Sequence, residues 1–391
     1  MKNFIHMLQT IYSHDFYHVM QELQESKQEC AIFLPCSEEM LQDPKIISQY
    51  STMISQLVVN YQLNLTECIF PDGVNVSNIA INGLKKIIQM IHLSDIKDGH
   101  DDGKIVFICF TGEIHNGFYK YFKDHGLTPI VMMTGHDSNH IKNLYFQHLD
   151  DLYEAYCCLN PYDGSREVFL ASILGDCSHK LDDYLFANFP QYLMPGFLPQ
   201  PGDILFDGGA FDGGTGKMFK DMGCEVYSFE LDKKNYENAR RVADENGFVL
   251  ENMGLGKKEE EVSYVVNNAG SWIDDRGNAN SKIIDIDTYV ARKQLPQVDF
   301  IKFDIEGSEL DGLRGAEKTI REYKPKLAIS IYHKPEDMYT LIRYIKTIRP
   351  DYEIAFRHHK CDFSPNMSEM ARQYRLGNSF PTCWEKVIYA R

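Results

Sequence analysis

The sequence predicts an α/β fold with a mostly parallel, doubly wound sheet, and three observations support this prediction. The apolar run Ile204–Phe206 ends in Asp207 and leads into a glycine cluster and a helical pattern. From Asp203 onward, short apolar strands alternate with helical patterns, as they do in parallel sheets. Polar residues follow the predicted strands, at the edge where an open α/β sheet binds its ligand.

A length of 391 residues favours two domains, and four prolines between residues 190 and 201 are typical of a linker. We therefore place a domain boundary near residue 195. Residues 1–195 are expected to form a smaller N-terminal α/β domain with connecting helices. Within this domain the apolar runs Ile105–Phe110 and Pro129–Met133 flank a helical pattern and predict a β-α-β unit. Its expected role is structural, in dimerisation, or in binding a portion of a substrate.

The composition limits the kinds of partner that the protein is expected to bind. The formal net charge is −16 and the sequence shows no basic patch, so nucleic acids and anionic membranes are not expected partners. Ten cysteines occur without a C-x-x-C pair, which is the usage of reduced core cysteines in a cytoplasmic protein. No apolar run reaches the length of a membrane helix. We expect a cytoplasmic protein without membrane insertion, and a homodimer is a reasonable hypothesis for its assembly.

The turn after the first strand of the second domain predicts a nucleotide-type ligand. A dinucleotide fingerprint reads G-x-G-x-x-G, whereas this turn has glycines at Gly209, Gly213 and Gly214, after the acidic Asp207. A carboxylate there disfavours a pyrophosphate and suits a cationic ligand such as S-adenosylmethionine (SAM). Glu230 ends the next strand about 20 residues downstream, the spacing at which a carboxylate binds ribose hydroxyls. The two carboxylates together favour SAM over other nucleotides.

Further polar residues follow the other predicted strands and extend this site. Asn252 ends the third strand and is placed to meet an adenine ring. The expected cofactor-binding residues belong to the glycine turn and to the strand ends: Asp207, Gly208, Gly209, Ala210, Gly213, Thr215, Glu230, Leu231, Asn252, Met253 and Asp304. Glu306, His333 and His358 lie at the remaining strand ends, where the chemistry is expected.

Several short segments resemble the signature of FkbM-type SAM-dependent methyltransferases. These segments are Asp207–Gly213, Ile286–Asp287, Ile301–Glu309 and Leu313–Ala316. The segments that are similar to the subgroup with an extra N-terminal domain are Ser330–Lys334, Arg357–His358 and Val387–Ala390. The resemblance covers about residues 160–391. It implies for residues 196–391 a class I methyltransferase fold, with a Rossmann-like, mostly parallel seven-stranded sheet and an antiparallel last strand.

The resemblance also implies O-methylation of a hydroxyl group on a sugar, nucleotide sugar, glycan or related metabolite, with SAM as cofactor. Such a hydroxyl group must lose its proton as the methyl group approaches, and histidine is the commonest general base. His333 is the first candidate for this role and His358 the second, with Asp304 as an orienting or accepting carboxylate. The residue spacing requires no metal. Asp304, Glu306 and His333 nevertheless offer the mixed oxygen and nitrogen ligands that a divalent cation uses.

Two alternatives remain open at the level of the sequence. One is an N-methyltransferase on the same fold, because the fold does not decide the acceptor chemistry. The other is a non-catalytic SAM-binding module whose N-terminal half is the active half. Polar groups at every strand end argue against the second alternative, since a site that has lost its function has no reason to keep them.

Overall fold

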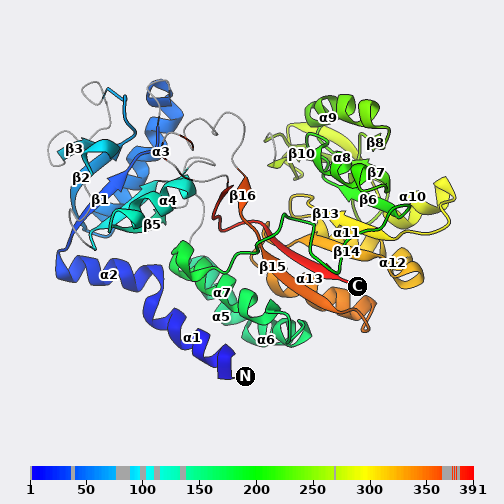
Figure 1. Cartoon of the computed structure of the whole chain (residues 1–391), viewed down its shortest axis with the longest axis horizontal. Coiled ribbons are helices and arrows are strands. Elements are labelled where there is room, and N and C mark those ends of the chain that lie inside the picture. The colour runs from blue at the N-terminus through cyan, green and yellow to red at the C-terminus, as the bar shows by residue number, and fades with distance from the viewer. Residues whose placement is uncertain are drawn as a thin grey trace. The chain divides into compact units, whose positions relative to one another are not determined.

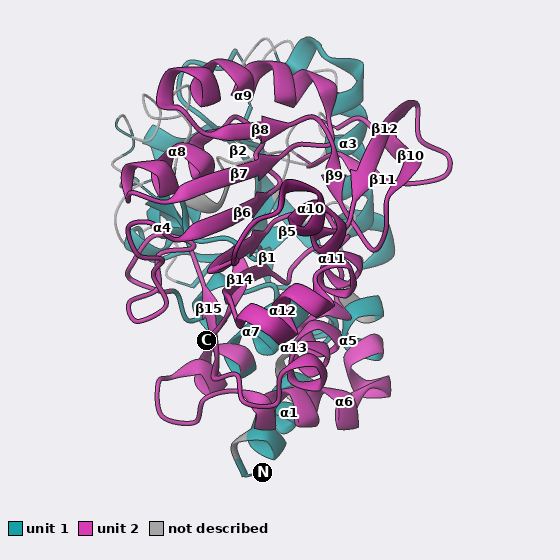
Figure 2. Cartoon of the chain, turned by 90° about the vertical axis from the view of Figure 1, so that its right-hand side faces the viewer, with its two compact units in different colours: residues 1–143, 170–186, 360–383 teal, residues 144–169, 187–359, 384–391 magenta. Residues whose placement is uncertain are grey.

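The structure, a computed structural model, describes most of the chain and divides it into two compact units. The described residues are 2–36, 40–75, 89–96, 103–109, 115–132, 138–267, 270–362, 372, 374, 376 and 379–391. Unit 1 consists of residues 1–143, 170–186 and 360–383, and unit 2 of residues 144–169, 187–359 and 384–391 (Figure 2). These units interleave along the chain, so they do not meet at a single boundary such as the one expected near residue 195.

Unit 1 contains a parallel sheet whose described strands follow the order β3-β2-β1-β4-β5 (Figure 1). The strands are β1 (Glu29–Phe33), β2 (Asn64–Phe70), β3 (Gln89–His92), β4 (Ile105–Cys109) and β5 (Thr128–Met132). The predicted β-α-β unit is confirmed as β4, α4 (His115–Asp124) and β5. Phe110 and Met133, at the ends of the two predicted strands, lie outside the described residues.

The other elements of unit 1 are mostly helical. They are α1 (Lys2–His14), α2 (Phe16–Ser26), α3 (Pro44–Ser55), the π-helical turn η2 (Gln56–Asn60), the 3-10 turns η1 (Met40–Gln42), η5 (Leu93–Asp95) and η6 (Leu181–Asp183), and the paired strands β16 (Cys361–Asp362) and β17 (Ser379–Phe380). Helices α5 (Ser138–Gln147) and α7 (Ser165–Ser178) contribute residues to both units. Asp15 begins α2 as an N-cap, because its carboxylate accepts a hydrogen bond from the amide of His18 at 2.8 Å.

Unit 2 contains the larger sheet, which positions the candidate site. Its described strands follow the order β15-β18-β14-β13-β6-β7-β8, and among them only β18 runs antiparallel to its neighbours. The strands are β6 (Ile204–Gly208), β7 (Glu225–Phe229), β8 (Val249–Glu251), β13 (Phe300–Phe303), β14 (Lys326–Ser330), β15 (Ile354–His358) and β18 (Lys386–Ala390). The predicted mostly parallel sheet with an antiparallel last strand is confirmed. The strand order reverses between β6 and β13, where an open α/β sheet leaves a crevice for its ligand.

The two central strands are buried along their whole length, which explains their nearly continuous apolar sequences. Every residue of β6 and of β13 is buried. The exception to the apolar pattern is a pair of charged residues, Asp207 and Lys302, which lie directly opposite each other in the ladder between the two strands. The sheet register therefore brings a carboxylate and an ammonium group together in the interior.

Helices cover this sheet, and a small second sheet extends from it. The helices are α6 (Leu149–Cys158), α8 (Gly214–Asp221), α9 (Lys233–Asn246), α10 (Ile286–Lys293), α11 (Glu309–Gly315), α12 (Glu317–Tyr323) and α13 (Asp337–Ile348). Helices α8 and α9 pack on each other; α8 also packs on β7, and α9 packs on β8. Helix α11 packs on α10, α12 and α13. The small sheet has the order β11-β10-β12-β9 and is formed by β9 (Gly254–Leu255), β10 (Glu260–Val265), β11 (Trp272–Ile273) and β12 (Ala279–Ile284).

Two aspartates fix the helix positions next to the sheet. Asp232 caps α9, because its carboxylate accepts the amides of Lys234 and Asn235 at 2.8 and 3.0 Å. Asp287, which belongs to one of the FkbM-like segments, accepts the amides of Lys318 and Thr319 at the start of α12. Of the helices that the structure describes, none is long and apolar enough to span a lipid bilayer.

Candidate active site

A cavity of about 230 Å³ opens at the carboxyl ends of β6, β7, β13 and β14. Its walls come from the turns that follow these strands, from the small sheet and from the residue before β18. The lining residues are Gly209, Phe211, Phe229, Glu230, Leu231, Asn235, Gly254, Leu255, Ser271, Ile273, Asp304, Ile305, Glu306, Ser308, Tyr332 and Glu385. Four of the predicted cofactor residues, Gly209, Glu230, Leu231 and Asp304, are thus brought together on the wall of one cavity.

The glycine turn after β6 has a shape that only glycine permits at its first position. Gly209 has a φ of 79°, and a Cβ atom there would lie 1.8 Å from the carbonyl oxygen of Asp304. The backbone of the turn can therefore lie directly against the end of β13. Phe211 follows with a φ of 49°, is 43% exposed and forms a section of the cavity rim.

Glu230 lies on the cavity wall one residue after β7, as predicted for a ribose-binding carboxylate. Its two oxygens accept the backbone amides of Phe211 and Asp232, each at 2.8 Å, and the side chain is 7% exposed. Each oxygen keeps a second lone pair for a ligand hydroxyl group. Burial raises the pKa of Glu230 to about 7, against the lowering effect of the two amides. The carboxyl group is held in one orientation but changes charge near neutral pH.

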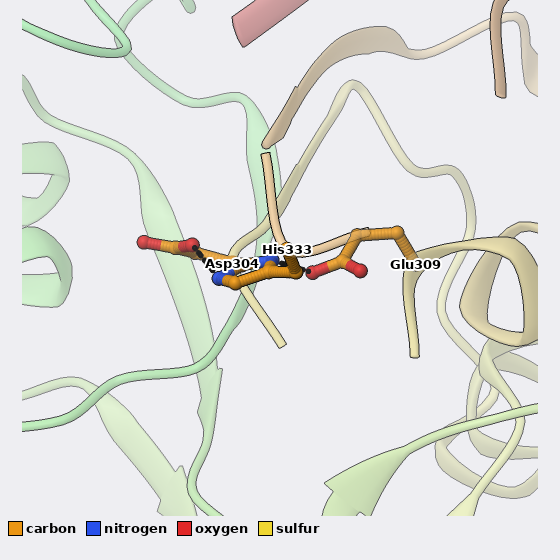
Figure 3. A group of neighbouring side chains, drawn as sticks. All are labelled: Asp304, Glu309 and His333. Atoms are coloured by element: carbon orange, nitrogen blue, oxygen red, sulfur yellow. Dashed lines mark ion pairs between the residues drawn. The ribbon is translucent and has the colours of Figure 1, made fainter. Parts of the chain in front are cut away.

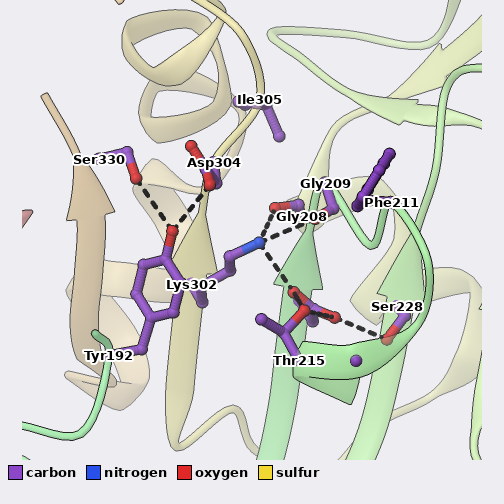
Figure 4. Close-up of polar contacts among 12 residues, drawn as sticks. Tyr192, Gly208, Gly209, Phe211, Thr215, Ser228, Lys302, Asp304, Ile305 and Ser330 are labelled. Carbon is purple, nitrogen blue, oxygen red and sulfur yellow. Dashed lines mark hydrogen bonds and ion pairs between the residues drawn. The ribbon is translucent and has the colours of Figure 1, made fainter. Parts of the chain in front are cut away.

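Asp207 belongs to a buried polar network at the end of β6, whose residues Lys302, Thr215 and Ser228 are labelled in Figure 4, and it is not among the described residues that line the cavity. Its carboxylate pairs with the ammonium group of Lys302 at 3.1 Å, and both side chains are almost completely buried. It also accepts hydrogen bonds from Ser228 at 3.0 Å and from Thr215 at 3.1 Å. Lys302 donates in addition to the carbonyl oxygens of Gly208 and Gly209. This buried ion pair therefore holds the turn in shape from below, which differs from the direct ligand contact expected for Asp207.

Several other predicted cofactor residues also lie off the cavity wall. The side-chain amide of Asn252 donates to the backbone oxygen of Glu230 at 3.1 Å and so supports that residue. The predicted cofactor residues that do not belong to the described lining of the cavity are Asp207, Gly208, Ala210, Gly213, Thr215, Asn252 and Met253. Direct contacts of these residues with a cofactor stay a prediction.

Asp304 follows β13 and lies between two tyrosines on the cavity wall. The hydroxyl group of Tyr192 donates to Oδ2 at 2.8 Å, and that of Tyr332 donates to Oδ1 at 3.0 Å. Burial acts to raise the pKa of Asp304, but the charges of Lys302 and His333 outweigh it and hold this pKa below its usual value. Asp304 is therefore an ionised carboxylate with a fixed orientation, and its remaining lone pairs can accept a ligand hydrogen bond.

His333 lies among three carboxylates, of which Figure 3 shows Asp304 and Glu309. Its Nδ1 is 2.9 Å from Glu309, and its Nε2 is 3.4 Å from Asp304 and 3.5 Å from Glu306. Burial lowers the pKa of His333, but the three carboxylates together raise it well above its usual value. These carboxylates therefore favour the positively charged form of the imidazole ring, with a proton on each nitrogen. The role of His333 as the general base stays a prediction.

His358, the second candidate base, does not reach the cavity in the described structure. It ends β15, which is the edge strand of the sheet and is separated from β13 by β18 and β14. Its side chain is completely buried and does not belong to the described cavity lining. The prediction that it ends a strand is confirmed. The strand order, which the sequence does not show, places that end away from Asp304 and His333.

Backbone strain gathers around this cavity. Tyr192, Phe211 and Glu306 have φ angles of 63°, 49° and 54°, in the left-handed region that residues with a Cβ atom rarely adopt. Phe211 and Glu306 line the cavity, and Tyr192 contacts its Asp304. Strained residues of this kind persist where the surrounding structure fixes them, and they cluster at functional sites.

Lys302 and Tyr192 are among the residues of the site that the sequence analysis missed. Lys302 interrupts an otherwise apolar strand, and this interruption was a usable signal for a buried ion pair. Tyr192 lies in the proline-rich segment before β6, more than a hundred positions from its partner Asp304. Nothing in the local pattern around Tyr192 indicates this contact.

The mostly parallel sheet with its antiparallel strand β18, and the cavity at the reversal of strand order, are those expected of a class I methyltransferase fold. Residues 207–363 match the sequence model of the Methyltransferase FkbM domain. The chain therefore contains an FkbM methyltransferase domain, as the resemblance implied, and the protein is a methyltransferase.

One solved structure agrees with this fold over its whole length, and two others match with low TM-scores. The methyltransferase FkbM from Methylobacillus flagellatus KT is 18% identical and superposes with a TM-score of 0.64, over 100% of this chain and 98% of that chain. A SAM-dependent methyltransferase from Aquifex aeolicus is 15% identical, with a TM-score of 0.26 over 50% of this chain and 84% of that chain. An rRNA methylase from Streptococcus thermophilus is 14% identical, with a TM-score of 0.28 over 49% and 86%. No match was found among curated proteins.

Proposed function

We propose that this protein transfers the methyl group of SAM to a hydroxyl group of a sugar, nucleotide sugar, glycan or related metabolite. The position of Glu230 is the observation that supports SAM as the cofactor. Glu230 is a buried carboxylate on the cavity wall, fixed by two backbone amides and with free lone pairs. This arrangement fits the two hydroxyl groups of a ribose. Gly209 also lines the cavity, where the lack of a side chain lets a ligand approach the backbone of the turn.

The opposite side of the cavity supports a hydroxylated acceptor. It is formed by carboxylates and hydroxyl groups, from Asp304, Glu306, Ser308, Tyr332 and Glu385. Groups of this kind accept and donate hydrogen bonds to a substrate with many hydroxyl groups. An acceptor in this position would lie between the cofactor side of the cavity, at Glu230, and the carboxylates after β13.

We assign the proton-accepting role to Asp304. SAM supplies the methyl group: its C–S bond breaks with the electron pair left on sulfur, while the acceptor oxygen forms the new C–O bond and the hydroxyl proton leaves. Asp304 is fixed by Tyr192 and Tyr332, so it can orient the hydroxyl group toward the methyl carbon and take its proton. His333, whose Nε2 lies 3.4 Å from Asp304, is not required as the base in this assignment.

Calorimetric titration with SAM and with its demethylated product tests the cofactor assignment. We expect micromolar binding by the wild-type protein and binding weaker by about tenfold or more in Glu230→Ala, because a charged hydrogen-bond partner is lost. The matched control is Glu245→Ala, on the exposed side of α9, where the glutamate pairs only with Arg241 in the described structure. This control should bind like the wild type. A folded wild-type protein that binds neither ligand would contradict the proposal.

The binding of SAM should become tighter as the pH rises through 7. Because burial raises the pKa of Glu230 to about 7, about a tenth of these carboxyl groups are ionised at pH 6 and about nine tenths at pH 8. The ionised form accepts hydroxyl hydrogen bonds more strongly. We therefore expect an affinity about ninefold higher at pH 8 than at pH 6. The neighbouring charges of Asp232 and Lys302 act on Glu230 in opposite directions. The Glu230→Gln variant should lose this pH dependence, and a wild-type affinity that is flat over this range would contradict the assignment.

The acceptor class can be tested with labelled SAM and a panel of sugars in which one hydroxyl group is replaced by hydrogen or by an amino group. Loss of methyl transfer on replacement by hydrogen identifies the methylated position. Faster transfer to the amino sugar would contradict O-methylation.

A further inference from the structure

The cluster around His333 has the arrangement of a metal-binding site. Asp304 and Glu306 approach Nε2 of the imidazole ring, and Glu309 approaches Nδ1. Figure 3 shows Asp304 and Glu309 on either side of the ring. Asp304 and Glu306 also line the cavity. One ligand atom from each of Asp304, Glu309 and His333 lies within 4.8 Å of the others. The ring therefore has two carboxylates on the side of the cavity and one on the side of the protein interior.

The separations on the cavity side fit ligands of one ion better than hydrogen-bond partners. Nε2 is 3.4 Å from the Asp304 carboxylate and 3.5 Å from that of Glu306, which is longer than an ordinary hydrogen bond. Ligand atoms that each lie about 2.0–2.2 Å from a common ion are about 3.0–3.5 Å from one another in octahedral or tetrahedral geometry. The two nitrogen–oxygen distances therefore fall in the range of ligand–ligand edges around one ion.

The buried polar atoms of the cluster provide a second, independent observation. The side chain of His333 is 8% exposed and that of Glu309 is completely buried. Within the described residues, neither ring nitrogen of His333 has a contact with hydrogen-bond geometry, and Oε2 of Glu309 has no hydrogen-bond partner. Such atoms are costly to bury without a partner. An ion between the cavity-side ligands would satisfy Nε2.

Glu309 has the position of an outer carboxylate that orients a metal-binding histidine. Its Oε1 lies 2.9 Å from Nδ1 of His333 and accepts the backbone amide of Ile305 at 2.9 Å. Metal-binding histidines commonly donate their second ring N–H group to such a carboxylate, which fixes the ring orientation and raises the basicity of the ligand. Glu309 has the distance to Nδ1 that this role needs, while the contact falls outside hydrogen-bond geometry.

We propose that Asp304, Glu306 and His333 bind one divalent cation, with Glu309 as the residue that positions the imidazole ring. Two carboxylates and one imidazole suit a cation such as Mn²⁺. The coordination positions that these three residues leave open face the cavity. This inference rests on the proposed function for its role: the cation would hold the acceptor hydroxyl oxygen and lower the pKa of that hydroxyl group, so that a weakly basic carboxylate suffices to take the proton.

Titration of the full-length, chelator-treated protein with Mn²⁺, followed by electron paramagnetic resonance, tests this site. We expect one bound ion per chain in the wild type. Binding should weaken by at least tenfold in Glu306→Gln and in His333→Gln, and by about 10- to 100-fold in Glu309→Gln, the usual effect of losing an outer carboxylate. The matched control is Asp311→Asn on α11, which removes an exposed carboxylate that pairs only with Arg314 in the described structure and should leave Mn²⁺ binding unchanged.

The result is independent of methyl transfer. The metal site is contradicted if Mn²⁺ fails to bind up to about 1 mM, or if it binds equally to wild type, Glu306→Gln and His333→Gln. SAM binding and methyl transfer are tested by the separate experiments described above. Circular dichroism shows whether each variant is folded. The Glu306 side chain is only half-buried and its contact with His333 is long, so its variant keeps the test valid if His333→Gln does not fold.

Discussion

Replacing Lys302 with methionine should lower the free energy of unfolding by about 3–5 kcal/mol, the usual effect of leaving one buried charge without its partner. Asp207 would then keep only the hydroxyl groups of Ser228 and Thr215 as hydrogen-bond donors from side chains of the described residues. The loss should be visible in urea denaturation as a lower midpoint. Because Lys302 also donates to the carbonyl oxygens of Gly208 and Gly209, the glycine turn should lose order in the same variant.

A double variant separates the ion pair from the general effect of changing a buried residue. In Lys302→Met combined with Asp207→Asn, no unpaired charge remains in the interior, so the loss of stability should be smaller than in Lys302→Met alone. If the two single effects simply add, Asp207 and Lys302 do not interact as the structure indicates. Such a result would contradict the proposal that the Asp207–Lys302 ion pair holds the glycine turn in shape.

Replacing Asp304 with asparagine should lower kcat for methyl transfer by a factor of about 10²–10⁴, the contribution typical of a general base. The amide has nearly the same shape as the carboxylate and keeps one acceptor oxygen for Tyr192 or Tyr332, but it cannot take a proton. Binding of SAM should change by less than about threefold, because Glu230 carries the cofactor contact in our proposal. The measurement uses labelled SAM and the best acceptor from the sugar panel.

Asp311→Asn provides a carboxylate-to-amide control near the site, and it should retain wild-type turnover because Asp311 is exposed and pairs with Arg314. Unchanged kcat in Asp304→Asn would rule out Asp304 as the proton acceptor. A loss of SAM affinity equal to the loss of turnover would instead show that Asp304 acts on the cofactor and not on the acceptor.

The sequence predicted the sheet of unit 2 well because its signals are local. Apolar strands and a glycine turn identify β6 and α8 directly, and Glu230 follows from its distance along the chain. The role of Asp207 was predicted less well, because the residue that neutralises it lies on β13, about a hundred positions away, and is found only through the strand register.

The candidate catalytic residues show more clearly that a local pattern cannot predict long-range contacts. A histidine after an apolar strand predicts a position at the sheet edge, and His333 and His358 both fit that pattern. Strand order decides which of them lies beside Asp304, and β18 enters the sheet between β14 and β15. The charge of His333 depends on three carboxylates that gather around one ring. A pattern within a short stretch of sequence cannot predict that these three carboxylates surround one histidine.

The edge of the larger sheet depends on a segment from much earlier in the chain. Leu159 forms a bridge with Ile354 of β15, and the backbone amide of Asn160 donates to the carbonyl oxygen of Ile354 at 2.8 Å. Ser165 accepts hydrogen bonds from the amide of Phe356 and from the guanidinium group of Arg357. A recombinant methyltransferase domain that starts near residue 196 would therefore expose the unpaired backbone of β15, and such open edges promote aggregation. A fragment intended for crystallisation or for assays should retain residues 144–169.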